Sequence, residues 1–409
     1  MSGLIEEYNY AGLQCSEKKD FHGAIRWFDK ALEGTPSPII LFNLANAYRG
    51  MGELQKAIEH YLKSLVYAPQ YNLTRNMLLE CLAPCRSLHI DGKPNIAELL
   101  VKFRDDMGWP DVLENPSSTK EFLHLYAAAC RCTPDSVVLD ISAGFCRNKD
   151  FFLHTQYVSI DLEVASDWNW DFSKLDLIGD ALNLPIKKNS IDMILNSSSL
   201  EHYPDPFAAF AEFSRVLKPG GFLYLDAPFT HVEHQIPHDY FRFSRYGLNY
   251  LCSRYGLAPL SITPDSSYLM GGYRMLFEAL SAFKNTDFVK NGLPERGKAA
   301  EEAMAYLEAK VKPLFIDIDQ DPLLCPEGLS STITNCTQYP IRYNLVAKKP
   351  GEQLPSRRYS SRAALLTEIV ECPACHAAQL DWSASQCQCM SCEMIFGRNE
   401  YAIPRLVIS

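Results

Sequence analysis

Three aspartates and one asparagine in the middle of the sequence each follow a short apolar run. They are Asp140, Asp161, Asp180 and Asn196. A carboxylate before a glycine-containing turn, with a second carboxylate about 20 residues further on, is an arrangement that binds adenosine-containing cofactors. Asp140, the turn through Gly144 and Asp161 have this arrangement. These residues therefore predict a binding site for a cofactor of the adenosine type.

The elements that must position these side chains are the apolar runs themselves. The runs at 137–139, 157–160, 177–179 and 191–195 alternate with helical segments, and a further strand follows the turn at 219–221. Strands that alternate with helices form a parallel sheet covered on both faces, and ligands bind beyond the carboxyl ends of its strands. The predicted fold class is therefore α/β, with a Rossmann-like sheet.

Four cysteines near the end of the sequence form two C-x-x-C pairs, Cys372 with Cys375 and Cys389 with Cys392. Four thiolates at this spacing favour a tetrahedral zinc site. A segment of this length buries little apolar surface, so that the metal would replace a core. Two alternatives stay open: a rubredoxin-like iron site, and a ligand set in which Cys387 takes the place of Cys389.

The N-terminal part of the sequence is repetitive. Ala24 corresponds to Ala57, and Phe28 corresponds to Tyr61, at the same spacing along the sequence. This spacing is close to the period of about 34 residues of the tetratricopeptide repeat, which this part resembles. The small residues let paired helices approach closely, and the aromatic residues fill the space between neighbours. The repeats would form a docking groove for a protein or peptide, or alternatively a helical spacer without a ligand. The predicted capping helices are 72–84 and 95–107.

Five motifs occur in order along the middle region. They are VLDISAG at 138–144, SID at 159–161, GDALNLP at 179–185, SLEH at 199–202 and RVLKPGG at 215–221. Together they resemble the class I S-adenosylmethionine-dependent methyltransferases, and the resemblance implies that S-adenosylmethionine is the cofactor. It places Asp140, Ser142 and Gly144 beside the methionine part, Asp161 on the ribose hydroxyls, Asp180 and Ala181 on the adenine, and Asn196 under the sulfonium.

The turn after Asp140 departs from the pattern of this family. The family carries D-x-G-x-G-x-G, whereas this chain has Ser142, Gly144 and Cys146 at the three glycine positions. A side chain at Ser142 or Cys146 would narrow the turn, or would be tolerated where φ stays negative. Asp140 also argues against a nicotinamide site, because its charge would repel a pyrophosphate but not a cationic sulfonium.

Histidines that follow the fourth and fifth strands are the candidate bases. His202 follows the fourth strand, and His231, His234 and His238 follow the fifth. Histidine titrates near neutral pH, which suits a base. The segment 231–242 resembles the acceptor-side loop of methyltransferases that modify sugars and glycans. Two alternatives stay open for its histidines, a metal site and a loop without chemistry.

The end of the sequence resembles the small zinc-ribbon family that includes an activator subunit of RNA and protein methyltransferases. The features that it shares are the two cysteine pairs, then Phe396, Ile403 and Pro404. The resemblance implies a zinc-ribbon fold and a contact on the methyltransferase domain. It does not imply an RNA substrate.

Composition narrows the possible classes of protein. The chain has 409 residues and a formal net charge of −10, which argues against a generic nucleic-acid binder. It has no apolar run long enough for a transmembrane helix and no secretory signal at its N-terminus. Fourteen cysteines without such a signal predict a reducing, cytoplasmic location.

The sequence as a whole predicts a methyltransferase in several parts. The predicted domains are 1–116 (helical repeats), 117–349 (methyltransferase), 350–362 (linker) and 363–409 (zinc ribbon). The expected reaction is methyl transfer from S-adenosylmethionine to an O or N atom of a sugar, a glycan intermediate or another small metabolite. The alternatives are a non-catalytic scaffold with the cofactor fold, and a protein or RNA methyltransferase that uses the repeats for docking.

Overall fold

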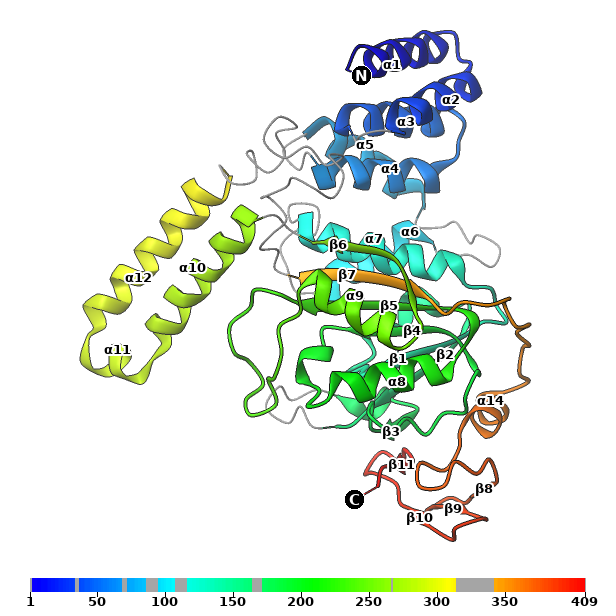
Figure 1. Cartoon of the computed structure of the whole chain (residues 1–409). Helices are drawn as coiled ribbons and strands as arrows, with labels where there is room; N and C mark the ends of the chain where they lie inside the picture. The colour runs from blue at the N-terminus through cyan, green and yellow to red at the C-terminus, as the bar shows by residue number, and fades with distance from the viewer. Residues whose placement is uncertain are drawn as a thin grey trace. The chain divides into compact units, whose positions relative to one another are not determined.

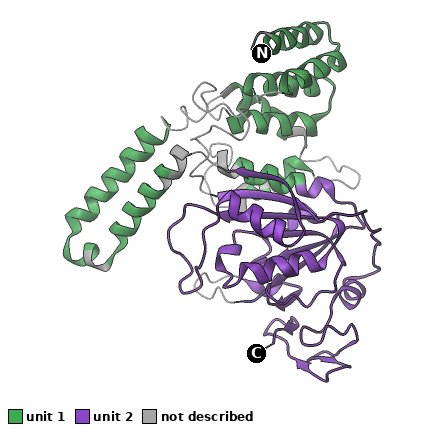
Figure 2. Cartoon of the chain, viewed as in Figure 1, with its two compact units in different colours: residues 1–127, 265–341 green, residues 128–264, 342–409 purple. Residues whose placement is uncertain are grey.

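The chain divides into two compact units, shown on a computed structural model (Figure 1, Figure 2). The helical unit comprises residues 1–127 and 265–341, and the sheet unit comprises residues 128–264 and 342–409. The domain boundaries expected from the sequence stay predictions. The structure describes residues 2–33, 37–67, 72–85, 95–106, 116–163, 171–265, 268–313 and 342–408.

The N-terminal helices of the helical unit pack in pairs, α1 on α2 and α3 on α4. Asp20 caps α2 by accepting from the Gly23 amide, and Ser37 caps α3 by accepting from the Ile40 amide. Phe28 is fully buried, and a Cβ added at Gly12 would lie only 2.4 Å from its ring. The helices are α1 (Ser2–Glu17), α2 (Phe21–Leu32), α3 (Pro38–Gly50), α4 (Leu54–Tyr67), α5 (Asn72–Cys85) and α6 (Ile96–Asp106).

These contacts confirm how the repeated residues were expected to act. Ala24, Ala57 and Tyr61 are as fully buried as Phe28, and Ala24 and Phe28 belong to one apolar cluster. The two capping helices occur as α5 and α6, although position 107 of the second lies outside the described residues. After α7 (Pro116–Arg131) the chain enters the sheet unit.

Replacing Phe28 by alanine is expected to destabilise the repeat helices by about 3–5 kcal/mol, because the ring is completely enclosed. Hydrogen exchange of the α1 to α4 amides should accelerate by about 100-fold or more, since each tenfold corresponds to about 1.4 kcal/mol. Tyr10, which is exposed on α1, is the control site. Equal exchange rates in Phe28→Ala and Tyr10→Ala would show that the ring does not hold these helices together.

A second group of helices in the helical unit comprises α10 (Tyr268–Asn285), α11 (Asp287–Gly292) and α12 (Pro294–Tyr306), followed by the π-helical turn Leu307–Val311. Among the described side chains, Tyr273, Val289 and Ala300 are buried here. Figure 1 shows α10 and α12 as an elongated helical pair (yellow).

The sheet unit contains an eight-stranded mixed sheet in the order β11-β3-β2-β1-β4-β5-β7-β6. Its central strands are parallel, whereas β7 runs antiparallel to β5 and β6. Every residue of β1 is buried, as a strand covered on both faces requires. This topology confirms the predicted α/β, Rossmann-like fold class. The strands are β1 (Val137–Ile141), β2 (Gln156–Asp161), β3 (Leu177–Gly179), β4 (Ile191–Ser197), β5 (Leu217–Pro228), β6 (Ala258–Pro264), β7 (Arg342–Lys348) and β11 (Arg405–Leu406).

Three helices add apolar side chains to the main core of the sheet unit: α8 (Pro206–Val216), α9 (Arg245–Arg254) and α14 (Arg362–Ile369). Asp205 caps α8 and Ser244 caps α9. The end of the chain, residues 371–408, is named the tail. It forms a small antiparallel sheet of β8 (Leu380–Trp382), β9 (Cys387–Cys389) and β10 (Ile395–Phe396).

The tail returns to the large sheet through β11, which pairs in parallel with β3 at the sheet edge. Arg405 lies opposite Ile178, and the Ile178 amide donates to the Pro404 carbonyl at 2.9 Å. The buried tail residues Phe396 and Leu406 belong to the same apolar core as the sheet. Within the described part of the chain, no helix has both the length and the apolar character needed to cross a bilayer.

Candidate functional site

The turn that follows β1, residues 142–146, is named the cofactor turn. Three of its residues have a positive φ: Ser142 at 58°, Gly144 at 54° and Cys146 at 62°. Positive φ therefore occurs at each position where the related family has glycine, and the alternative in which φ stays negative at Ser142 and Cys146 is wrong. For a residue with a Cβ this conformation costs roughly 1–2 kcal/mol, so contacts elsewhere must hold the turn.

Asp161, at the end of β2, is one of the groups that hold the cofactor turn. Its carboxylate accepts from the Gly144 amide and from the Glu163 amide, each at 2.9 Å. Burial raises the pKa of Asp161, and these two backbone amides oppose that rise. The carboxylate oxygens keep lone pairs that could accept from a bound hydroxyl.

Asp180 follows β3 and is half-buried. Its carboxylate accepts from the Leu182 amide at 2.8 Å, and the neighbouring Ala181 is buried. The side chain of Asn183, two positions further on, donates to the Pro373 carbonyl of the tail at 3.1 Å. The segment that was predicted to contact adenine is thereby tied to the tail.

Asp140 points into the protein interior. It accepts from the Tyr157 hydroxyl at 2.6 Å and from the Asn148 amide at 3.3 Å. Burial raises the pKa of Asp140 to about 6, although these hydrogen bonds oppose the rise. Asp140 is not among the residues that line the cavity described below, so it supports the cofactor turn from the protein interior.

The raised pKa of Asp140 predicts a pH dependence of stability. Because the folded protein keeps a proton that the unfolded chain releases near pH 4, the free energy of unfolding should fall between about pH 4 and pH 6, by up to about 3 kcal/mol. Asp140→Asn removes this contribution, so that the variant should gain stability relative to the wild type as the pH rises. Urea unfolding of both proteins across this range tests the expectation, and parallel curves would contradict it.

A hydrogen-bonded cluster connects the ends of β1 and β4. Asn196 is fully buried and donates to the Tyr203 hydroxyl at 2.8 Å, and Ser142 lies 2.7 Å from the same hydroxyl. The Asn196 amide also reaches Ser199 at 2.8 Å. Tyr203 thus helps to hold Ser142 at its positive φ. Sequence reasoning missed Tyr203, although its place directly after His202 was a signal.

The carboxyl ends of the first four strands surround one cavity of about 480 Å³. Ser142, Asp161, Asp180 and Ala181 line it, whereas Asp140, Gly144 and Asn196 are not among its lining residues. The full lining comprises Ile141, Ser142, Asp161, Leu162, Gly179, Asp180, Ala181, Leu182, Ser197, Ser198, Ser199, His202, Tyr203, Pro204, Gln235, Ile236, Pro237, His238 and Tyr240.

His202 and part of residues 231–242, named the acceptor loop, also line the cavity. Of the four predicted histidines, His202 and His238 line the cavity, whereas His231 and His234 do not. His202 Nδ1 lies 2.6 Å from the His238 carbonyl oxygen. Burial lowers the pKa of His202, and the nearby Glu201 carboxylate opposes this. The predicted roles of all four histidines stay predictions.

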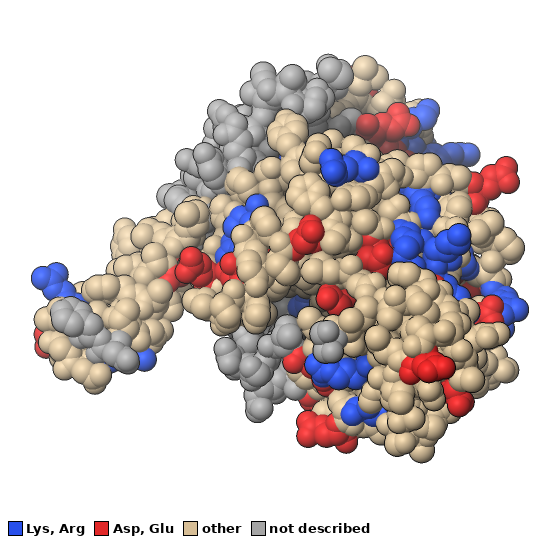
Figure 3. All heavy atoms as spheres, turned by 60° about the horizontal axis from the view of Figure 1, so that its bottom comes forward, with Lys and Arg blue, Asp and Glu red and all other residues tan. Residues whose placement is uncertain are grey.

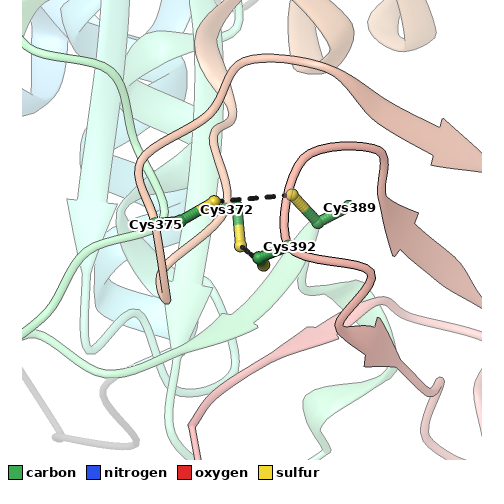
Figure 4. A group of neighbouring side chains, drawn as sticks. All are labelled: Cys372, Cys375, Cys389 and Cys392. Atoms are coloured by element: carbon green, nitrogen blue, oxygen red, sulfur yellow. Dashed lines mark hydrogen bonds between the residues drawn. The ribbon is translucent and has the colours of Figure 1, made fainter.

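The four cysteines of the tail lie together, with their sulfurs pointing toward one another (Figure 4). Cys372 Sγ lies 3.7 Å from Cys392 Sγ, and Cys375 Sγ lies 3.6 Å from Cys389 Sγ. Tetrahedral zinc with Zn–S bonds of about 2.3 Å places its sulfurs about 3.8 Å apart, so the arrangement fits zinc. The cluster contains Cys389 and not Cys387.

The tail also contacts the cofactor turn. Ile403 shares a small apolar cluster with Ala143 and Cys146. Glu163, whose amide bonds Asp161, accepts from Asn399 at 2.6 Å and pairs with Arg405 at 3.0 Å. The last residues of the chain therefore support the cavity wall from outside.

Two parts of the chain match known protein families. Residues 130–225 match the family described as a methyltransferase domain, and residues 38–71 match the tetratricopeptide repeat. Both resemblances expected from the sequence are confirmed.

Curated relatives include the demethylmenaquinone methyltransferase of Staphylococcus saprophyticus, 27% identical over 165 residues that cover 38% of this chain and 67% of the relative. The demethylmenaquinone methyltransferase of Renibacterium salmoninarum is 32% identical over 155 residues, which cover 35% of this chain and 62% of the relative. Across the relatives the matched part spans from a quarter to about two thirds of their own length. A solved phosphoethanolamine N-methyltransferase 2 of Haemonchus contortus has a TM-score of 0.35 at 13% identity, covering 62% of this chain and 57% of that one.

Proposed function

We propose that this chain, of which residues 130–225 match a methyltransferase domain, transfers a methyl group from S-adenosylmethionine to an O or N atom of a sugar, a glycan intermediate or another small metabolite. The class of acceptor is the part of this proposal that goes beyond the matched domain. Its support is the cavity and the acceptor loop rather than the named relatives, which match only part of their own length.

One observation carries the proposal. Asp161, Asp180, His202 and His238 all line the same cavity. Its volume of about 480 Å³ falls in the range of roughly 300–1,000 Å³ that small-molecule sites occupy. Such a cavity suits a nucleoside cofactor with a small acceptor group beside it.

S-Adenosylmethionine, when bound, supplies an electrophilic methyl group on a positively charged sulfur. The residues of the chain then have three tasks in this proposal. Asp161 accepts from the two ribose hydroxyls in charge-assisted hydrogen bonds, and Asp180 with Ala181 contacts the adenine. Ser142 and the rest of the cofactor turn receive the methionine part. His202 and the acceptor loop hold the acceptor in line with the methyl group, where correct orientation supplies most of the acceleration.

Zinc is part of the same proposal. Cys372, Cys375, Cys389 and Cys392 would hold it, and the two sulfur separations of 3.6 and 3.7 Å support this assignment. The metal would be structural, because four thiolates fill a tetrahedral site and leave no open position. Its effect on the cavity would pass through Ile403 and Arg405.

A second candidate is a macromolecular acceptor brought by the tetratricopeptide repeats, which match residues 38–71. Repeats of this kind present concave surfaces to protein partners. The net charge of −10 speaks against RNA as that partner. Acidic side chains also lie between the basic ones on the face shown in Figure 3.

The experiment that separates these candidates follows the methyl group. The full chain is incubated with S-adenosylmethionine labelled on the methyl carbon, together with either the low-mass or the high-mass fraction of a cell extract. The proposal expects labelled product in the low-mass fraction, and Asp161→Ala should abolish it. Label confined to the high-mass fraction would favour the second candidate. A chain that does not bind the cofactor at all would favour the non-catalytic scaffold.

A further inference from the structure

A separate cluster of potential metal ligands lies beside the cavity. Glu201 and His202 belong to the short helix η5 (Leu200–His202), and His234 belongs to the acceptor loop. One ligand atom from each of the three lies within 4.8 Å of the other two. We propose that Glu201, His202 and His234 bind a divalent first-row transition-metal ion on the acceptor side of the cavity.

Hydrogen bonds orient both imidazoles toward Glu201. His202 Nδ1 donates to the His238 carbonyl at 2.6 Å, and His234 Nδ1 donates to the Val232 carbonyl at 3.1 Å. In each ring the lone pair is then left on Nε2. Histidines that bind metals usually hold their second ring nitrogen in this way. Both Nε2 atoms lie 3.8 Å from Glu201 Oε1.

These separations suit a cation bound between the three side chains better than direct hydrogen bonds between the histidines and the carboxylate. At 3.8 Å the histidines are too far from the carboxylate for hydrogen bonds. A tetrahedral ion with bonds of about 2.1 Å separates its ligands by about 3.4 Å, so each Nε2 is only a few tenths of an ångström further from the carboxylate than such an ion requires. Among the described residues, neither Glu201 Oε2 nor His202 Nε2 has a hydrogen-bond partner, and both atoms are buried.

The charge at this place also favours a cation. The Glu201 side chain is only 2% exposed, and a buried carboxylate needs a compensating charge. Arg242 interacts electrostatically with Glu201, but its guanidinium is engaged by Asp239 through two hydrogen bonds of 2.6 and 2.8 Å. The backbone is fixed as well, because the Tyr240 amide donates to the Glu201 carbonyl at 2.9 Å and so ties the acceptor loop to η5.

The ligand types indicate which ion would bind. Two imidazoles and one carboxylate suit zinc, iron(II), manganese or cobalt, whereas magnesium and calcium prefer oxygen ligands. Three protein ligands leave coordination positions open, and His202 lines the cavity. The ion would therefore face the acceptor.

The chemical role of this ion rests on the proposed methyl transfer. It narrows the acceptor atom of that transfer to an oxygen. A metal lowers the pKa of a hydroxyl bound to it, and the released proton passes to solvent. The oxygen attacks the methyl carbon, and a C–O bond forms while the C–S bond breaks and its electron pair returns to sulfur. His202 then acts as a ligand rather than as a base.

Cobalt(II) titration of the full chain, first loaded with one equivalent of zinc to fill the cysteine site, tests the proposal. We expect one further equivalent of cobalt to bind with weak visible bands and without the near-ultraviolet thiolate band that a cysteine site would give. Glu201→Gln and His234→Ala should each weaken this binding by about 100-fold or more, since changes to groups that only orient a ligand already cost roughly 10–100-fold. Glu233→Gln is the matched control and should leave cobalt binding unchanged, because Glu233 is exposed in the same loop, does not line the cavity and is not one of the three ligands.

Two results would overturn the metal site: no cobalt bound beyond the cysteine site, or binding that Glu201→Gln and His234→Ala leave unchanged. The cobalt spectrum of the wild-type protein is measured without any substitution, so a variant that fails to fold cannot hide whether the site exists. Binding of S-adenosylmethionine to the same samples separates the two proposals. A chain that binds the cofactor and no cobalt disproves only the metal site, whereas one that binds cobalt and no cofactor disproves only the proposed function.

Discussion

Replacing Asp161 by alanine is expected to weaken S-adenosylmethionine binding by about 100-fold or more. Each hydrogen bond from a ribose hydroxyl to this carboxylate should contribute about 1.5–3 kcal/mol, because one partner is charged. The variant also loses the acceptor for the Gly144 and Glu163 amides. Because Gly144 lies in the cofactor turn, the variant loosens a second wall of the cavity. Calorimetric titration of both proteins measures the change.

The matched control for this variant is Asp171→Ala. Asp171 is exposed, caps a short helix in the same unit by accepting from the Ser173 amide, and does not line the cavity. Its removal should leave cofactor affinity within about twofold, as expected for a surface change away from the site. An Asp161→Ala protein that binds as tightly as Asp171→Ala would remove Asp161 from the cofactor site.

Loss of the tail metal should have the second large effect. Structural zinc contributes roughly 10–16 kcal/mol of binding free energy in zinc-finger peptides, and here it would join the two cysteine pairs of the tail. Cys375→Ser removes one ligand at an exposed position, so that packing changes little. We expect the tail to unfold in this variant and β11 to leave the edge of the large sheet.

The damage should then reach the cavity. Ile403 packs against the cofactor turn, and Arg405 holds Glu163. Without these contacts Ser142 and Cys146 lose part of what keeps them at positive φ, and cofactor affinity should fall by about tenfold, equivalent to about 1.4 kcal/mol. Proteolysis of the tail and calorimetry measure the two effects, with exposed Cys130→Ser as the control. A protease-resistant tail in Cys375→Ser would contradict a structural metal.

The parts of the fold that follow local patterns could be predicted from the sequence. Strand ends carry polar residues because the chain leaves the sheet there, which is why Asp161 and Asp180 were found and do line the cavity. The paired cysteines were found because metal ligands recur at fixed spacing. The helical pairs followed from the repeat of small and aromatic residues.

Features that depend on contacts distant in sequence could not be predicted. The pairing of β11 with β3 involves a strand of two residues, too short to give a periodic signal. Asp140 resembled a cofactor ligand in sequence, but only the fold reveals that Tyr157 and Asn148 turn it inward. Glu201 passed unnoticed because it meets His234 only when the acceptor loop folds back over η5.

We propose that the ends of β1, β2 and β3 converge on one site for S-adenosylmethionine. Hydrogen exchange of the full chain, measured with and without this cofactor, tests it most directly. We predict that the cofactor slows exchange in residues 142–146, 161–163 and 179–182 together and leaves α1 to α4 unchanged. Exchange that stays the same in all three segments at saturating cofactor would contradict it.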